Sequence, residues 1–323
     1  MKAMDKIATT EMRNPASVGI DRKSTWEILR IINTEDKKVP YAVETALDEI
    51  AAVTDRVVAA FKQGGRLLYI GAGTSGRLGV LDASECPPTY GVSPQMVQGI
   101  IAGGEAALTH SIEGAEDDGQ AGEDACKAHH LTSKDVLIGI TANGGAPFVV
   151  QALRYAKSLG CAISAISCNQ VTPVFDLVEP KMRIYLPVGP EIITGSTRMK
   201  SGTAQKLVLN MITTTAMIRL GKVYNNLMVD LKPVNAKLVD RSIRMIQEIT
   251  ACGEEMARDA FRESGSDTRK AIVMVALGVD APQAERLLSD RESLGQLFSV
   301  HHPKRLAKGM EENLLGKAKK ERL

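Results

Sequence analysis

The sequence predicts an α/β fold: a doubly wound, mostly parallel five-stranded sheet in a three-layer domain, followed by a small C-terminal helical bundle. Three observations support this. Between residues 51 and 225, short apolar runs alternate with helical patterns, as in parallel strands joined by helices. Several of these runs are continuously apolar, which is typical of strands buried on both faces. After Pro233 the pattern becomes wholly helical, with short joints between the helices.

The N-terminal region, residues 1–50, is predicted to be a helical segment. Trp26, Leu29 and Ile32 share one face of a short helix at residues 25–32. Pro40 opens a longer helix, which a pair of glycines at positions 64 and 65 ends. The apolar positions of this longer helix are Val43, Ala46, Leu47, Ile50, Val53, Val57 and Phe61.

The remaining elements follow in chain order. In the sheet domain, residues 51–225, we expect strands at 66–70, 96–102, 135–141, 162–168 and 183–187 and helices that include 147–159 and 197–220. A linking helix is expected at 226–252 and a small helical domain at 253–300. The helices of this region are predicted at 234–252, 253–264, 268–277 and 281–289. Residues 301–323 are predicted to form a basic tail.

The composition is that of a globular protein and excludes several classes of function. Hydrophobic residues make up 44% of the 323 positions and the net charge is +2, so no nucleic-acid partner is expected. No stretch is apolar for long enough to span a membrane and no apolar leader is visible, so we expect a cytoplasmic protein. The five cysteines form no CxxC pair, and the histidines lack a third ligand at metal-site spacing. Neither a disulfide framework nor a metal site is therefore predicted.

A glycine-rich turn after the first predicted strand indicates a phosphate site. Gly73, Thr74, Ser75 and Gly76 offer backbone N–H groups and two hydroxyls to an anion. The turn also matches the G-x-G-x-x-G dinucleotide fingerprint, but no acidic residue follows the second strand at the spacing that a ribose needs. The two hydroxyls favour the terminal phosphate of a sugar. The alternative is that the glycines only make a tight turn.

Two further loops are candidates for the same pocket. Asn143, Gly144 and Gly145 follow the third predicted strand, and a plain turn is the alternative reading. Ser196 and Thr197 lie in a hydroxyl-rich segment where the long helix is predicted to begin. Helix capping accounts for one of them, and a third wall of an anion pocket accounts for both.

Two carboxylates are candidates for acid–base chemistry. Glu85 follows the glycine turn by nine residues and has small and apolar neighbours. Glu116 lies in an acidic stretch that would ordinarily be solvated surface.

Two long motifs give the sequence a specific resemblance. The run from Tyr69 to Tyr90 and the run from Gly195 to Asn210 closely resemble the bacterial N-acetylmuramic acid 6-phosphate etherase family. Shorter agreement at residues 20–22, 30–36 and 226–230 extends the resemblance from about residue 20 to about residue 300. It implies a sugar isomerase-type (SIS) domain, a small helical C-terminal domain, a cytoplasmic homodimer, and a sugar phosphate substrate with no cofactor or metal.

The resemblance also implies a reaction. Members of the family cleave the D-lactyl ether of N-acetylmuramic acid 6-phosphate to N-acetylglucosamine 6-phosphate and D-lactate, in cell-wall amino sugar recycling. Lactate is eliminated from the open-chain sugar and water is added back. The family's two glutamates fall on Glu85, the expected proton donor, and on Glu116. As an acid, Glu85 is expected to hold a proton near neutral pH, through burial or a nearby like charge.

The sequence departs from the family in the second loop. Many members have a Ser-Gly-Arg-Thr-Pro type of sequence where residues 143–147 read Asn-Gly-Gly-Ala-Pro. Two other functions stay open. One is a non-catalytic sugar-phosphate regulator of the glucokinase regulatory protein type, although that protein has two SIS domains. The other is a sugar-phosphate isomerase, which needs a base but no acid that releases lactate.

Overall fold

A computed structural model describes residues 8–231, 233, 235–289, 293–301, 303 and 305–307. The chain divides into two compact units, the first formed by residues 1–85 with 93–216 and the second by residues 86–92 with 217–323. Most of the predicted basic tail lies outside the described residues. The finer boundaries predicted at residues 50, 225, 252 and 300 remain predictions. None of the described helices combines the length and apolar character that a membrane crossing requires.

The first unit is built on a five-stranded sheet, as predicted. All neighbouring strands are parallel and their order is β2-β1-β3-β4-β5. Four of the strands lie within the runs that the sequence indicated, and β1 ends one residue beyond its predicted run, at Gly71. The strands are β1 (Leu67–Gly71), β2 (Val97–Ile101), β3 (Val136–Ile140), β4 (Ala162–Ser167) and β5 (Arg183–Tyr185).

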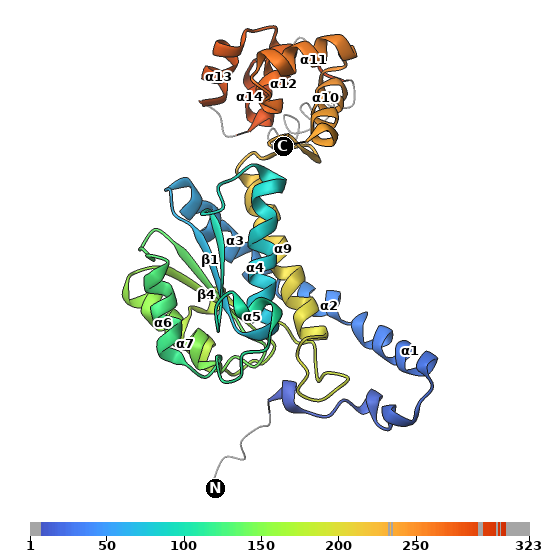
Figure 1. Ribbon diagram of the computed structural model, residues 1–323, viewed down its shortest axis with the longest axis vertical. Coiled ribbons are helices and arrows are strands. Elements are labelled where there is room, and N and C mark those ends of the chain that lie inside the picture. Colours follow the sequence, from blue (N-terminus) through green and yellow to red (C-terminus); the bar gives the residue numbers. More distant parts are fainter. Residues whose placement is uncertain are drawn as a thin grey trace, which may run out of the picture. The chain divides into compact units, whose positions relative to one another are not determined.

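Helices cover both faces of the sheet and complete the three predicted layers. Helices α6 (Gly119–Ala128) and α7 (Pro147–Ser158) lie on one side, and α4 (Gly73–Tyr90) and α9 (Lys200–Arg219) on the other (Figure 1). Successive side chains of β1 point to opposite faces of the sheet, so the strand packs against both helical layers. Leu68 and Ile70 join the core that contains Phe148 of α7. Tyr69 faces α4, where a Cβ at Gly79 would lie 2.9 Å from its side chain. Short helices α5 (Ala106–Thr109), α8 (Pro173–Leu177) and η4 (Pro180–Met182) complete the connections.

The N-terminal region begins with three short turns, η1 (Thr9–Glu11), η2 (Pro15–Ser17) and η3 (Ile20–Arg22). The predicted helix at residues 25–32 is confirmed as the longer α1 (Thr25–Asp36). Its start is a capping box, in which Ser24 accepts from the Glu27 N–H and Glu27 accepts from the Ser24 N–H.

The prediction of one helix from Pro40 to the glycine pair is wrong, because the segment forms α2 (Val39–Glu44) and α3 (Leu47–Lys62). In a continuous helix the Ala46 N–H would bond the Ala42 carbonyl. The Thr45 hydroxyl donates to that carbonyl at 2.8 Å instead, and the Ala46 N–H turns to Val43. Leu47, which the sequence analysis placed among the apolar positions of one helix, is exposed.

The second unit contains a helical bundle, as predicted. Its helices are α10 (Ala236–Thr250), α11 (Glu254–Glu263), α12 (Thr268–Leu277), α13 (Ala281–Ser289) and α14 (Leu294–His301). The start predicted for the first of these, Val234, lies outside the described residues. Ile246 and Ile249 of α10 share one core with Ile272 of α12. The sequence pattern did not indicate α14 or the antiparallel hairpin of β6 (Val223–Tyr224) and β7 (Leu227–Met228).

Candidate active site

The predicted phosphate turn is shorter than the sequence suggested. Strand β1 ends at Gly71 and α4 already begins at Gly73, so Thr74 and Ser75 lie in the first turn of a helix. Gly73 has a positive φ of 53°. A Cβ at Gly76 would lie 2.6 Å from the Ile101 side chain, so packing alone requires that glycine. The first turn of a helix presents unbonded N–H groups and the positive end of the helix dipole, which suit an anion.

Ser75 is tied to the helix that packs beside α4. Its hydroxyl donates to the Gln205 Oε1 atom at 2.9 Å, and both side chains are buried. The Nε2 atom of Gln205 is buried and has no hydrogen-bond partner in the described part of the chain. Gly202 allows the close approach of the two helices, because a Cβ there would lie 3.3 Å from the Thr74 methyl group.

The hydroxyl-rich wall is a loop rather than a helix start. Helix α9 begins at Lys200, so neither Ser196 nor Thr197 caps it, which corrects the predicted start at residue 197. The cap is the fully buried Glu191, whose carboxylate accepts from the N–H groups of Lys200 (3.1 Å) and Ser201 (2.8 Å). A carboxylate at a helix N-terminus is favourable because it faces the positive end of the dipole.

The loop after β3 is bonded within itself. The Asn143 Oδ1 atom accepts from the Gly145 N–H at 2.9 Å, and the Thr141 hydroxyl oxygen accepts from the Gly144 N–H at 3.2 Å. Gly144 has a φ of 81°, and a Cβ there would lie 2.4 Å from the Thr172 side chain. These two N–H groups therefore have partners already, and a ligand would have to displace them.

Glu116 lies beside that loop, between α5 and α6. Its backbone carbonyl accepts from the Phe148 N–H in the first turn of α7, at 3.0 Å, and its side chain is exposed. Because α4 follows β1 and α7 follows the neighbouring β3, both helix starts lie at the carboxyl edge of the sheet. This edge of an open parallel sheet is where ligands usually bind. The structure thus brings Glu116, the glycine turn and the loop after β3 to one edge.

Glu85 does not join them within the same chain. It lies twelve residues after Gly73 on α4, and a helix rises by 1.5 Å per residue, so the two are roughly 18 Å apart along the axis. This separation exceeds the length of a monosaccharide phosphate.

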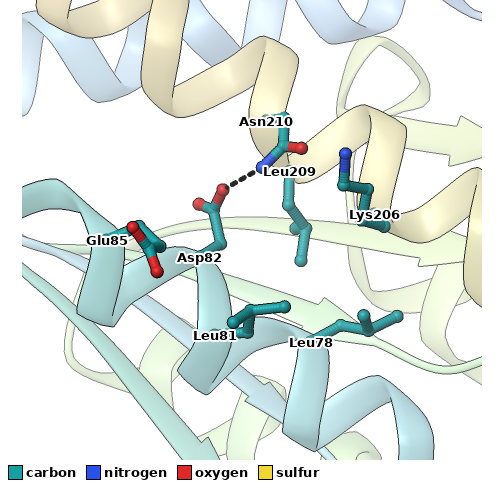
Figure 2. A pocket seen from close by; sticks show the side chains of 7 residues that line it. All are labelled: Leu78, Leu81, Asp82, Glu85, Lys206, Leu209 and Asn210. Carbon is teal, nitrogen blue, oxygen red and sulfur yellow. Dashed lines mark hydrogen bonds between the residues drawn. The ribbon is translucent and has the colours of Figure 1, made fainter. Parts of the chain in front are cut away.

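Glu85 instead lines a pocket of about 260 Å³ between α4 and α9 (Figure 2). The pocket is lined by Leu78, Leu81, Asp82 and Glu85 of α4 and by Lys206, Leu209 and Asn210 of α9. Of the two environments expected for Glu85, burial or a nearby like charge, burial is not observed: the side chain is exposed. The buried carboxylate of this pocket belongs to Asp82, one turn earlier on the same helix face.

Asp82 is held firmly. It accepts hydrogen bonds from Asn210 Nδ2 at 2.7 Å, from the Tyr69 hydroxyl at 3.1 Å and from the Thr213 hydroxyl at 3.2 Å. Burial raises the pKa of Asp82, while these hydrogen bonds and the charge of Lys206 oppose the rise. Asp82, Lys206 and Asn210, which line this pocket, were not among the residues predicted from the sequence. Two spacings in the sequence could have indicated them: Asp82 lies three residues before Glu85 on α4, and Lys206 and Asn210 lie four residues apart on α9, so each pair shares one helix face.

The cysteines are not part of this site. All five are buried. Burial raises the pKa of Cys126 and of Cys168 to about 12, so these thiols are poor nucleophiles.

Comparison with known proteins agrees with this fold and shows the family. Residues 49–157 match the family model described as the glucokinase regulatory protein N-terminal SIS domain, so this part of the chain is a domain of the SIS class. The N-acetylmuramic acid 6-phosphate etherase of Photorhabdus laumondii is 54% identical and aligns over 86% of this chain and 92% of its own length. The enzyme of the same name from Serratia proteamaculans is 52% identical, over 88% of this chain and 95% of its own length. The one from Glaesserella parasuis is 53% identical, over 90% of this chain and 95% of its own length. The chain belongs to the N-acetylmuramic acid 6-phosphate etherase family, which confirms the resemblance seen in the sequence.

Proposed function

We propose that this protein is a carbon–oxygen lyase that cleaves the D-lactyl ether of N-acetylmuramic acid 6-phosphate to N-acetylglucosamine 6-phosphate and D-lactate. The observation that carries the proposal is the exposed carboxyl group of Glu85 at the α4–α9 pocket, in a chain that aligns with named etherases over nearly its whole length. We further propose that the protein is cytoplasmic and acts in the recycling or catabolism of cell-wall amino sugars.

The proposed reaction uses two carboxyl groups. With the sugar ring open, the aldehyde at C1 acidifies the proton on C2. A base removes that proton, the C2–H electrons form the C2–C3 double bond, and the C3–O electrons leave with the lactyl oxygen. Glu85 gives that oxygen its proton, so D-lactate departs as an alcohol. Water then adds at C3, and Glu116 is the second carboxyl group for these proton transfers.

The phosphate is proposed to bind at the carboxyl edge of the sheet. The first turn of α4 offers the backbone N–H groups of Gly73, Thr74 and Ser75, and the helix dipole favours an anion there. Gly76 is proposed to line the same turn, although its N–H already donates to the Ala72 carbonyl at 3.4 Å. Asn143, Gly144, Gly145, Ser196 and Thr197 are proposed to complete the contacts to the sugar phosphate. The internal hydrogen bonds of the loop after β3 give it a smaller share of the phosphate contact than the α4 turn.

We infer a homodimer in which each site takes Glu85 from a second copy. One reason is the separation of roughly 18 Å along α4 between Glu85 and the glycine turn. The other is α1, whose large apolar side chains are not buried by the described residues: Trp26 is 65% and Leu29 60% exposed. A second copy that covers α1 would bury both.

The first test is release of D-lactate from N-acetylmuramic acid 6-phosphate by the native protein and by Glu85→Gln. We expect release by the native protein and a loss of at least about 100-fold in kcat for the variant, because general acid catalysis is removed. Glu113→Gln, an exposed acid near Glu116, is the matched control and should retain activity.

A second candidate, a non-catalytic sugar-phosphate regulator, is favoured only by the match of residues 49–157 to the regulatory-protein model. If the folded native protein binds the sugar phosphate but releases no D-lactate, the etherase proposal is wrong and the regulator takes its place.

A further inference from the structure

The α4–α9 pocket has a chemical character that the glutamate chemistry does not use. Its walls are apolar, from Leu78, Leu81 and Leu209, and one cation, Lys206, stands among them (Figure 2). Elimination and proton transfer at the sugar need neither an apolar wall nor a cation beside the proton donor. The lining of the pocket therefore suits a ligand group that is part apolar and part anionic.

Lys206 is available to such a ligand. Its side chain is exposed, and it forms no ion pair with any residue that the structure describes. The nearby carboxylate of Asp82 is buried and already accepts from Asn210, Tyr69 and Thr213. Asp82 thus connects the pocket wall to α9, and although the charge of Lys206 acts on Asp82 through space, its ammonium group forms no ion pair with Asp82 that would block an incoming anion.

We propose that this pocket is the subsite for the lactyl group, in which Lys206 binds the lactyl carboxylate. The inference rests on the proposed etherase function. The lactyl group carries a methyl group and a carboxylate on the carbon next to the ether oxygen, which matches the leucine walls and the single lysine. The α4 face from Leu78 to Glu85 is about 10 Å long. That length accommodates one hydrogen bond from Glu85 to the ether oxygen and one from Lys206 to the carboxylate.

The subsite makes Lys206 a determinant of specificity. An ammonium–carboxylate hydrogen bond is short and charge-assisted, and a neutral side chain cannot replace it. The enzyme should thus favour 3-O-ethers that carry a carboxylate over neutral ethers of the same sugar phosphate. The released D-lactate stays anionic throughout, so the contact is present in substrate and product alike.

The test compares two substrates and three proteins. The substrates are N-acetylmuramic acid 6-phosphate and its lactyl carboxamide, which is neutral at the same position but keeps the phosphate. The proteins are the native chain, Lys206→Met, and Lys134→Met as an exposed lysine far from the pocket in sequence. We expect Lys206→Met to lower kcat/KM for the acid by about 10- to 100-fold and to change kcat/KM for the carboxamide by less than about 3-fold. Lys206→Arg should recover most of the loss.

Each outcome decides a different point. If the native protein releases no D-lactate from the acid, the proposed function fails. If it does, and Lys206→Met loses equally on both substrates or on neither, the lactyl subsite is wrong while the function stands. An equal loss on both would place Lys206 at a part of the ligand that the two substrates share. Circular dichroism of each variant shows that it is folded, as an exposed side chain predicts.

Discussion

Removing the ammonium group of Lys200 should destabilise the first unit strongly. Lys200 is the first residue of α9, and its side chain is only 1% exposed. Its Nζ atom lies 2.8 Å from a carboxylate oxygen of Glu35, at the end of α1, which is 4% exposed. The pair joins the N-terminal helices to the loop that holds Ser196 and Thr197. Lys200→Met keeps the length of the side chain and removes only the charge and the hydrogen bonds.

The magnitude follows from what Glu35 retains. Breaking a buried ion pair by deleting one partner costs about 3–5 kcal/mol, because the other charge is left without its counter-charge. Glu35 keeps hydrogen bonds from Asn14 at 2.9 Å and from Lys38. We therefore expect the lower end, about 3 kcal/mol in the free energy of unfolding at pH 7. Lys38→Met is the control: Lys38 is 60% exposed, and its loss should cost less than about 1 kcal/mol.

The pH dependence makes the prediction sharper. Burial by itself raises the pKa of Glu35, but the hydrogen bonds from Lys200, Lys38 and Asn14 outweigh it and lower the pKa from 4.5 to about 2. A carboxyl group whose folded pKa is lowered stabilises the fold above its unfolded pKa and loses that contribution as the pH falls from 4.5 towards 2. In Lys200→Met much of that contribution is already gone. The difference in the free energy of unfolding between the native protein and Lys200→Met should therefore be largest at pH 7 and become smaller below about pH 4.5.

Urea unfolding followed by circular dichroism, at one protein concentration and at several pH values, measures this gap. The double variant Glu35→Gln/Lys200→Met removes both charges and should be more stable than Lys200→Met alone. Two results would refute the reasoning: a change of less than about 0.5 kcal/mol in Lys200→Met, or a gap that is the same at pH 4 and pH 7.

Two further predictions concern packing and assembly. Gly122→Ala would place a Cβ 2.0 Å from a backbone carbonyl of α7, so we expect the free energy of unfolding, measured in urea, to fall by about 3 kcal/mol. Gly119→Ala is the control, because its Cβ would have its nearest neighbour at 3.4 Å and should be nearly neutral. Similar stabilities of the two variants would contradict the close approach of α6 and α7. Mixing the inactive variants Glu85→Gln and Glu116→Gln under conditions of subunit exchange should restore about a quarter of the native D-lactate release, because half of the dimers are mixed and each has one intact site. Continued inactivity of the exchanged mixture would mean that both glutamates of a site come from one copy.

The sheet could be predicted because its cause is local. Residues 67–70 are all fully buried, and a run that is apolar on both faces appears as such in the sequence. Helix boundaries were less predictable where a distant or side-chain group decides them. The start of α9 depends on Glu191, nine residues upstream, and the break before α3 depends on one hydroxyl, that of Thr45. Neither contact leaves a periodic pattern in the chain.

In the candidate site, too, features with a local cause could be predicted and features that depend on distant contacts could not. Thr74 and Ser75 could be proposed from the sequence because their turn is a continuous motif. Lys206 and Asp82 were missed because 124 positions separate them, and only the packing of α9 against α4 brings them to one pocket. Glu85 shows the opposite error: nine residues from Gly76 look close in sequence, and a helix converts them into a separation of more than 10 Å. The spacing that suggested one compact site within a chain is therefore the reason for the proposal that Glu85 of one copy serves the glycine turn of a second copy.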